Sequence, residues 1–215
     1  GTYFAEQIRA IDRSYPFFEL VGQAGAGKSR LLEFLWRLSG REDYEGFDPS
    51  KATSVAIYRE FAQVSNMPIA LIEGDRNDED GKKSYSKFEW DQLKDAFNGR
   101  SIRSRGVKNN GNDTYSPPFR AAIMISQNEP IQASEAMLTR LLHIRLTREG
   151  QTLEGKHIVD ELDRIPLEVT SQFMAKAIRN EEAILATYQQ KVREYEAFYH
   201  AAGITHTRIA LNHAQ

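Results

Sequence analysis

The apolar residues of this chain fall into short runs separated by segments with helical spacing. Residues 15–21 are aromatic and aliphatic, and they predict a buried strand. In residues 29–40, leucines and a tryptophan recur at helical spacing, and Gly40 provides a stop. The chain therefore opens with a predicted strand that leads directly into a predicted helix.

The middle of the chain continues this alternation. Asp48 and Pro49 have the composition of an N-cap and a first helical position. Ser86 and Glu89 have the spacing of a capping box. We therefore expect a helix from 48 to about 65, a strand over 67–75 and a capped helix over 86–99.

The remaining pattern adds a hairpin, two strands and a helical tail. An Asn-Asn-Gly-Asn turn between two short polar runs is typical of a hairpin. From about Leu153 the spacing is helical almost throughout. The predicted elements are a hairpin over 101–118, a strand over 120–128, a helix over 134–142, a strand over 143–147 and a long helix from Asn180.

Strands that alternate with helices predict an α/β fold with a parallel central sheet flanked by helices. The last strand ends shortly before residue 150. We therefore expect a core over residues 1–150 and a C-terminal helical lid or cap over residues 151–215.

Composition excludes several classes of protein. The chain has no cysteine, so it has no disulfides and no thiolate metal site. No apolar run approaches the roughly 20 residues of a membrane span, and no signal peptide is recognisable. These features predict a soluble, cytoplasmic protein. The net charge of -2 argues against a broad nucleic-acid-binding face, although residues 73–80 are acidic and residues 100–108 are basic.

The first strand is followed by the sequence GQAGAGKS, which matches the P-loop pattern G-x-x-x-x-G-K-[ST]. Small residues let successive backbone N–H groups surround a phosphate at a helix N-terminus. Lys28 would reach the β- and γ-phosphates, and the Ser29 hydroxyl would bind Mg²⁺. The spacing does not fit a dinucleotide-binding motif, so the predicted ligand is a nucleoside triphosphate. The predicted nucleotide-binding residues are Gly22, Gly25, Ala26, Gly27, Lys28, Ser29 and Arg30.

The strand over 67–75 has the form of a Walker B strand, since it is apolar and ends in acidic residues. Glu73 could activate water or bind Mg²⁺, and Asp75 follows two residues later. Ile72 stands where the first Asp of the usual pair would be, so the roles of Glu73 and Asp75 stay open. A calcium loop is excluded because Asp80 and Ser86 replace its required Gly and Glu.

Two later side chains could complete a hydrolytic site. Asn128 ends an apolar strand, where a neutral amide can hold a water molecule or the γ-phosphate. It could also be an ordinary turn residue near Pro130. Arg140 could stabilise charge on the γ-phosphoryl group, in its own subunit or in a neighbour, or be a surface helix residue.

Taken together, these motifs resemble the superfamily 3 helicases, which are AAA+ motors of small viruses, phages and plasmids. The similarity runs from about Phe17 to Leu146. It implies that Asn128 is the motif C residue and that Arg140 is an arginine finger acting on a neighbouring subunit. It also implies a pore hairpin that grips DNA. The DNA-binding residues it implies are Arg103, Arg105, Lys108, Asn109 and Asn110, with Asn112 also in the hairpin.

The resemblance implies an ATPase of the phage or plasmid primase-helicase type. Such a domain forms a homo-oligomeric ring, expected to be a hexamer, and moves on single-stranded DNA with ATP and Mg²⁺. A primase domain would lie upstream in the native chain. Two alternatives stay open at this point. A non-motor AAA+ ATPase, such as a loader or assembly switch, would carry the same motifs, and so would a P-loop small-molecule kinase.

Overall fold

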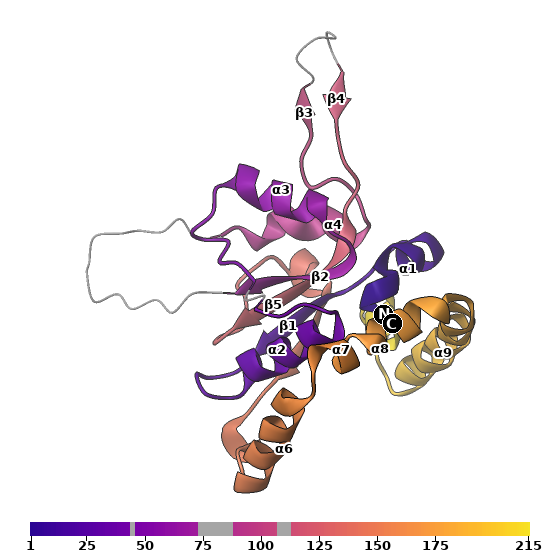
Figure 1. Ribbon diagram of the computed structural model, residues 1–215. Coiled ribbons are helices and arrows are strands. Elements are labelled where there is room, and N and C mark those ends of the chain that lie inside the picture. Colours follow the sequence, from indigo (N-terminus) through magenta and orange to yellow (C-terminus); the bar gives the residue numbers. More distant parts are fainter. Residues whose placement is uncertain (44–45, 73–87, 107–112) are drawn as a thin grey trace.

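The computed structural model describes residues 1–43, 46–72, 88–106 and 113–215. Its centre is a four-stranded sheet in which all paired strands are parallel. The strands follow the spatial order β2-β5-β1-β6, so β5 and β1 are the inner strands (Figure 1). Their carboxyl ends therefore meet at one edge, where open α/β sheets bind ligands. The strands are β1 Phe17–Val21, β2 Ser65–Ile72, β5 Arg120–Gln127 and β6 Leu141–Arg145.

The inner strands are apolar on both faces because helices cover both sides of the sheet. In β5, Ile123 and Ile125 are fully buried on one face, whereas Ala122 and Met124 pack on the other. The first face packs against Phe61, Trp90 and other apolar side chains of the middle segments. The helices there are α3 Ser54–Gln63, η2 Trp90–Leu93, α4 Lys94–Phe97 and α5 Glu135–Leu138.

The second face is covered by helices from both ends of the chain. Trp36 and Leu32 of α2 pack on Leu20 of β1. Beside them, Phe4 and Ile8 pack with apolar residues of the C-terminal helices. The N-terminal and α2 elements are η1 Thr2–Phe4, α1 Ala5–Asp12 and α2 Lys28–Leu38.

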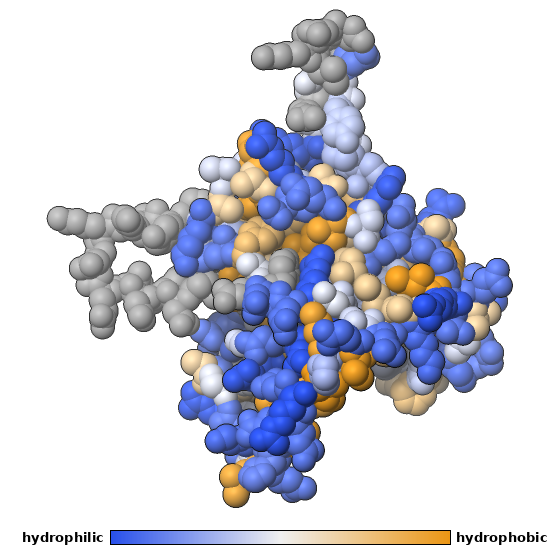
Figure 2. Space-filling view, viewed as in Figure 1, coloured by the Kyte–Doolittle hydropathy of each residue, from blue (hydrophilic) through white to orange (hydrophobic). Residues whose placement is uncertain are grey.

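The C-terminal third is helical, as predicted. No helix in the described residues is long and apolar enough to cross a membrane. In Figure 1, α9 lies beside α1, and the two chain ends lie close together. Figure 2 shows apolar side chains exposed near α7. The division after residue 150 stays a prediction. The elements are η3 Arg148–Gly150, α6 Leu153–Arg164, α7 Leu167–Thr170, α8 Gln172–Arg179, α9 Glu181–Ala201 and α10 Thr207–Ala214.

The predicted hairpin is present. Strands β3 (Arg105–Gly106) and β4 (Thr114–Tyr115) pair in antiparallel register, and they project from the body beside α3 (Figure 1). The turn that joins them lies outside the described residues.

Two predicted helix starts are wrong. The helix expected from Asp48 begins at Ser54 and is capped by Thr53, whose hydroxyl accepts a hydrogen bond from the Ala56 N–H at 3.3 Å. Phe47 instead extends the sheet, because its N–H donates to the Ala70 carbonyl at 3.1 Å. The Asp48 carboxylate then accepts the Ser50 N–H at 2.9 Å, which forms a turn.

The helix expected over 86–99 is also shorter than predicted. It starts as a 3-10 turn at Trp90 and becomes an α-helix only over Lys94–Phe97. Glu89 precedes this turn and makes no side-chain cap, and Ser86 lies outside the described residues. The predicted stop is confirmed, since Gly99 has a φ of 72°.

Candidate functional site

The predicted phosphate loop connects β1 to α2 at the carboxyl edge of the sheet. Gly25 and Gly27 have φ values of 81° and 92°, a backbone region that glycine adopts without strain. A Cβ atom at Gly27 would meet nothing within 4 Å, so this side of the loop is open. A Cβ at Gly22, by contrast, would lie 2.6 Å from the Leu146 carbonyl oxygen. The loop therefore has an open concave side and a packed side, which fits an anion-binding cradle.

Lys28 is the first residue of α2, and its ammonium group folds back over the loop. Its Nζ donates hydrogen bonds to the Gly22 carbonyl and, at 3.2 Å, to the Gln23 carbonyl. It also donates to Asn128 Oδ1 at 3.0 Å. The predicted P-loop lysine and the predicted motif C asparagine, one hundred residues apart in the chain, are therefore in direct contact.

The sheet brings these two residues together. Strands β1 and β5 are parallel neighbours, with Val21 paired to Gln127. The Gly22 N–H donates to the Gln127 carbonyl at 3.2 Å, so the pairing continues to the start of the phosphate loop. Asn128 directly follows Gln127, the last residue of β5, which places its amide beside the loop.

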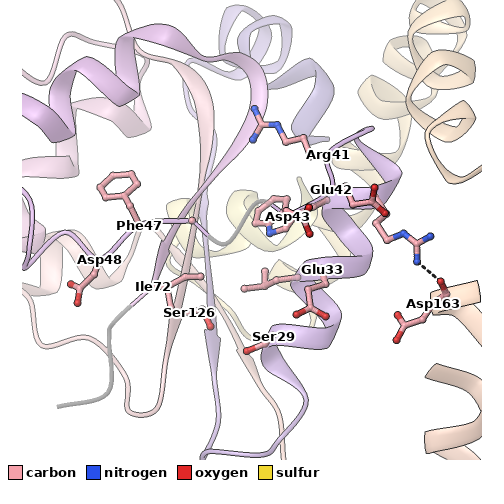
Figure 3. Close-up of a pocket in the computed structure, with 14 residues that line it drawn as sticks. Ser29, Glu33, Arg41, Glu42, Asp43, Phe47, Asp48, Ile72, Ser126 and Asp163 are labelled. Carbon is pink, nitrogen blue, oxygen red and sulfur yellow. Dashed lines mark hydrogen bonds between the residues drawn. The ribbon is translucent and has the colours of Figure 1, made fainter. Parts of the chain in front are cut away.

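Ser29 opens onto a pocket of about 600 Å³ beside the phosphate loop. Figure 3 shows Ser29 near Ser126 and Ile72, which lie at the carboxyl ends of β5 and β2. Five acidic side chains and two arginines also line this pocket. They are Glu33, Glu42, Asp43, Asp48, Asp163, Arg37 and Arg41.

The Arg30 side chain points away from the loop. Its Nη1 is 3.0 Å from Glu33 Oε2 and 3.3 Å from Asp163 Oδ2 in α6. Arg37 joins the same region, donating to the Asp163 carbonyl at 2.9 Å. Contact between the Arg30 guanidinium and phosphate would require it to leave these carboxylates, so its nucleotide-binding role stays a prediction.

The predicted acidic partners of Ser29 cannot be placed. Glu73 and Asp75 lie outside the described residues, directly after Ile72 at the end of β2. Among the residues that the structure describes, no group of three or more His, Asp and Glu side chains could hold a metal ion. The proposed Mg²⁺ ligands therefore stay a prediction from sequence.

Arg140 lies at the opposite edge of the sheet from the phosphate loop. Its carbonyl accepts the N–H of Phe17, the first residue of β1, at 3.0 Å. Its guanidinium lies 5.2 Å from the centre of the Phe97 ring and donates to the Ala136 carbonyl. Burial lowers the pKa of Arg140 from its ordinary value, and nearby Arg208 adds to this effect. Arg140 is therefore one strand length from its own phosphate loop, and its role as an arginine finger stays a prediction.

Two residues that the motifs do not identify support the site. The Arg148 guanidinium donates from Nε and Nη2 to the Ala24 carbonyl of the phosphate loop, at 3.1 and 2.5 Å. Glu19, fully buried in β1, accepts the Ile131 N–H at 2.6 Å and thereby fixes the segment that follows Asn128. A carboxylate in an otherwise apolar strand is a signal that could have pointed to Glu19. Nothing local points to Arg148.

Of the predicted DNA-binding residues, the structure places Arg103 and Arg105 at the base of the hairpin, with Arg105 in β3. Arg103 is exposed and lies over the Tyr58 ring of α3. Lys108, Asn109 and Asn110 lie outside the described residues.

Comparisons with known proteins support the fold. No protein-family model and no curated protein matches the chain. A solved structure described as the active helicase Cch of SCCmec type IV matches with a TM-score of 0.63 and 16% identity over 99% of this chain. The chain spans only 38% of that protein. A JCV helicase bound to a small molecule matches less well, with a TM-score of 0.45 and 12% identity over 80% of this chain and 46% of that chain, and supports no conclusion. The chain thus has a helicase-type α/β fold.

Proposed function

We propose that this chain is an ATP-hydrolysing DNA helicase or translocase domain of the superfamily 3 AAA+ type. It would act in the replication of a phage, plasmid or other mobile element. The observation that carries the proposal is the 3.0 Å hydrogen bond from Lys28 to Asn128. Two motif residues far apart in sequence meet at an open glycine-rich loop, as a triphosphate site of this type requires.

In this proposal, different parts of the described chain would bind the nucleotide and support its hydrolysis. The backbone N–H groups of the phosphate loop and of the first turn of α2 would hold the phosphates, since Gly25 and Gly27 leave the loop open. Lys28 is already held at this loop and would place positive charge on the terminal phosphates. Asn128 would position water or the γ-phosphate through its neutral amide.

Ser29 and the acidic residues after β2 would hold Mg²⁺, which neutralises phosphate charge when bound. Ser29 opens onto the pocket in Figure 3, at the same sheet edge as the end of β2. Glu73 would also activate the attacking water in this scheme. Asp75 would contribute either to Mg²⁺ binding or to the activation of water.

Arg140 and the hairpin extend the proposal to an assembly. Arg140 would serve a neighbouring subunit, because it lies at the far end of β1 from its own phosphate loop. The projecting hairpin would face DNA in a homo-oligomeric ring, expected to be a hexamer. The Cch neighbour is described as an active helicase, which favours this reading for a chain of the same fold.

Steady-state ATP hydrolysis with and without single-stranded DNA tests the proposal. We expect DNA to accelerate hydrolysis in the wild type, and Lys28→Ala to abolish hydrolysis in both conditions. Lys108→Ala should remove only the acceleration. A strand-displacement assay on a forked duplex then distinguishes a helicase from a non-motor AAA+ loader or switch, which would hydrolyse ATP without unwinding. A rate of ATP hydrolysis that does not depend on DNA, together with phosphate transfer to a metabolite, would favour the kinase alternative.

A further inference from the structure

A groove of about 530 Å³ runs between α3 and the base of the projecting hairpin. We name it the hairpin-base groove. Figure 1 shows α3 directly beside the foot of β3 and β4. Its lining includes Tyr58, Arg59 and Ala62 from α3, with Arg103, Tyr115 and Pro117 from the hairpin.

One wall of the groove is a preorganised stack. The Arg103 guanidinium lies 5.3 Å from the centre of the Tyr58 ring and donates to the Ser54 hydroxyl at 3.3 Å. The Tyr58 hydroxyl donates to Gln92 Oε1 at 2.8 Å, which fixes the ring from its other end. A planar cation held against an aromatic ring offers a flat surface on which a base can stack.

A second aromatic residue, Tyr115, also lines the groove. Tyr115 is 51% exposed and stands in β4, in register with Arg105. About half of this side chain is therefore accessible to a ligand in the groove. Aromatic residues exposed beside cations are typical of surfaces that bind single-stranded nucleic acid.

The charge of the groove differs from that of the chain as a whole. Arg59 and Arg103 are exposed lining residues, and no lining residue is acidic. The whole chain has a net charge of -2, so this local excess of positive charge is not an average property. It complements a phosphate backbone.

We propose that the hairpin-base groove binds single-stranded DNA by stacking a base against Tyr115 and the Arg103–Tyr58 pair, with Arg59 at a phosphate. This inference rests on the proposed DNA-dependent function but adds a different kind of contact. A hairpin that grips only the backbone is indifferent to the loss of bases, whereas a stacking groove needs them.

The test measures affinity by fluorescence anisotropy with a labelled oligothymidylate, in the presence of a non-hydrolysable ATP analogue. The variants are Tyr115→Ala, Tyr115→Phe and Tyr195→Ala. Tyr195 is a matched control, because it is 52% exposed on α9, outside the groove. A second oligonucleotide of equal length carries abasic sites throughout its central part. Thermal unfolding and sizing of each variant report on folding and on assembly.

We expect Tyr115→Ala to weaken binding on the order of tenfold, the range for one lost base–aromatic stack. Tyr115→Phe keeps the ring and should bind within about twofold of the wild type, as should Tyr195→Ala. The wild type should prefer the intact oligonucleotide to the abasic one, and Tyr115→Ala should lose most of this preference.

Four results would overturn the inference. Equal binding of intact and abasic DNA by the wild type would contradict base stacking in the groove, while the proposed motor function would remain. An unchanged affinity of folded Tyr115→Ala for DNA would show that the groove is not a DNA-binding site. A Tyr115→Ala variant that loses only self-assembly would assign the groove to a contact between copies. If the wild type hydrolyses ATP but binds no DNA, the DNA-dependent function and the groove fail together.

Discussion

Asn128 directly follows β5 and lies beside the phosphate loop. Its amide oxygen accepts a hydrogen bond from Lys28. If it orients water or the γ-phosphate, its removal should affect turnover more than binding. We expect Asn128→Ala to lower the rate of ATP hydrolysis by about 10²-fold, as for other single polar groups at a reacting centre. The affinity for ATP, measured with a fluorescent analogue, should change by less than about threefold.

Asn180→Ala is the control for this variant. Asn180 is exposed at the start of α9, and its amide donates to the Lys176 carbonyl at 2.7 Å, remote from the phosphate loop. Its removal should leave hydrolysis unchanged. Wild-type turnover by Asn128→Ala would show that Asn128 is an ordinary turn residue. The main support for the motor proposal would then be lost.

Arg148 gives a second prediction at this scale, because its guanidinium is held on the Ala24 carbonyl. We expect Arg148→Ala to weaken ATP binding by about fivefold, since an exposed charge-assisted hydrogen bond contributes roughly 1 kcal/mol. Arg145→Ala is the matched control, since Arg145 is an exposed arginine of the neighbouring strand β6. Equal nucleotide affinities in the two variants would show that the contact does not shape the loop.

The sequence predicts the candidate site unevenly, for a physical reason. Gly25, Gly27 and Lys28 act through local backbone geometry, so a short motif is enough to predict them. Asn128 needs only the additional assumption of parallel neighbouring strands. Arg148 reaches Ala24 across 124 residues, and that contact depends on how the segment after β6 packs on the phosphate loop. No local pattern encodes such a contact.

Among the elements, α9 is attached to the N-terminal helix by a specific polar contact. The Tyr188 hydroxyl donates to the Asp12 carboxylate, which also accepts Gln215 Nε2 at 3.2 Å. Ile184 and Leu185 of the same helix pack against the cluster around Phe4 and Ile8. We expect Tyr188→Phe to lower the free energy of unfolding by about 1 kcal/mol, measured by urea denaturation. Tyr195→Phe, an exposed change on the same helix, should have no measurable effect.

The same contact predicts a dependence on pH. Burial raises the pKa of Tyr188 above its ordinary value of 10.0, and the neighbouring Asp12 carboxylate raises it further. Above that ordinary value the unfolded chain releases a proton that the folded chain keeps. This contribution to stability is therefore complete below pH 10 and is lost as the pH rises through the folded pKa. The free energy of unfolding should fall less steeply above pH 10 in Tyr188→Phe; equal slopes in the two proteins would contradict this account.

Element boundaries were less predictable than element types. The apolar runs of β1 and β5 are buried at most of their positions, so hydrophobicity alone identifies these strands. The predicted start of α3 was wrong because Phe47 pairs with Leu71 at the sheet. This long-range interaction overrides the local helix-start signal of Asp48 and Pro49. The apolar side chains of α9 differ in burial along the helix. Its first half is packed, whereas Tyr195 and Phe198 are 52% and 63% exposed.

At the scale of the whole molecule, the proposed catalytic groups lie at opposite edges of one sheet. Lys28 and Asn128 stand at the carboxyl edge, and Arg140 stands at the amino edge beside Phe17. Strand β1, which separates them, spans five residues, or roughly 15 Å of extended chain. A single copy therefore has half of the proposed site at each edge, and two adjacent copies in a ring would complete it.

Mixing of two inactive variants tests this arrangement. Lys28→Ala and Arg140→Ala should each abolish hydrolysis alone, but an equal mixture should regain activity. If subunits mix at random, about a quarter of the interfaces join an intact Lys28 to an intact Arg140 of the neighbour. Arg140 also stacks on Phe97, so the variant must first show wild-type thermal unfolding and ATP binding. A mixture that stays inactive, although sizing shows mixed rings, would contradict a role for Arg140 in the neighbour's site and would leave Arg140 with a structural role beside β6.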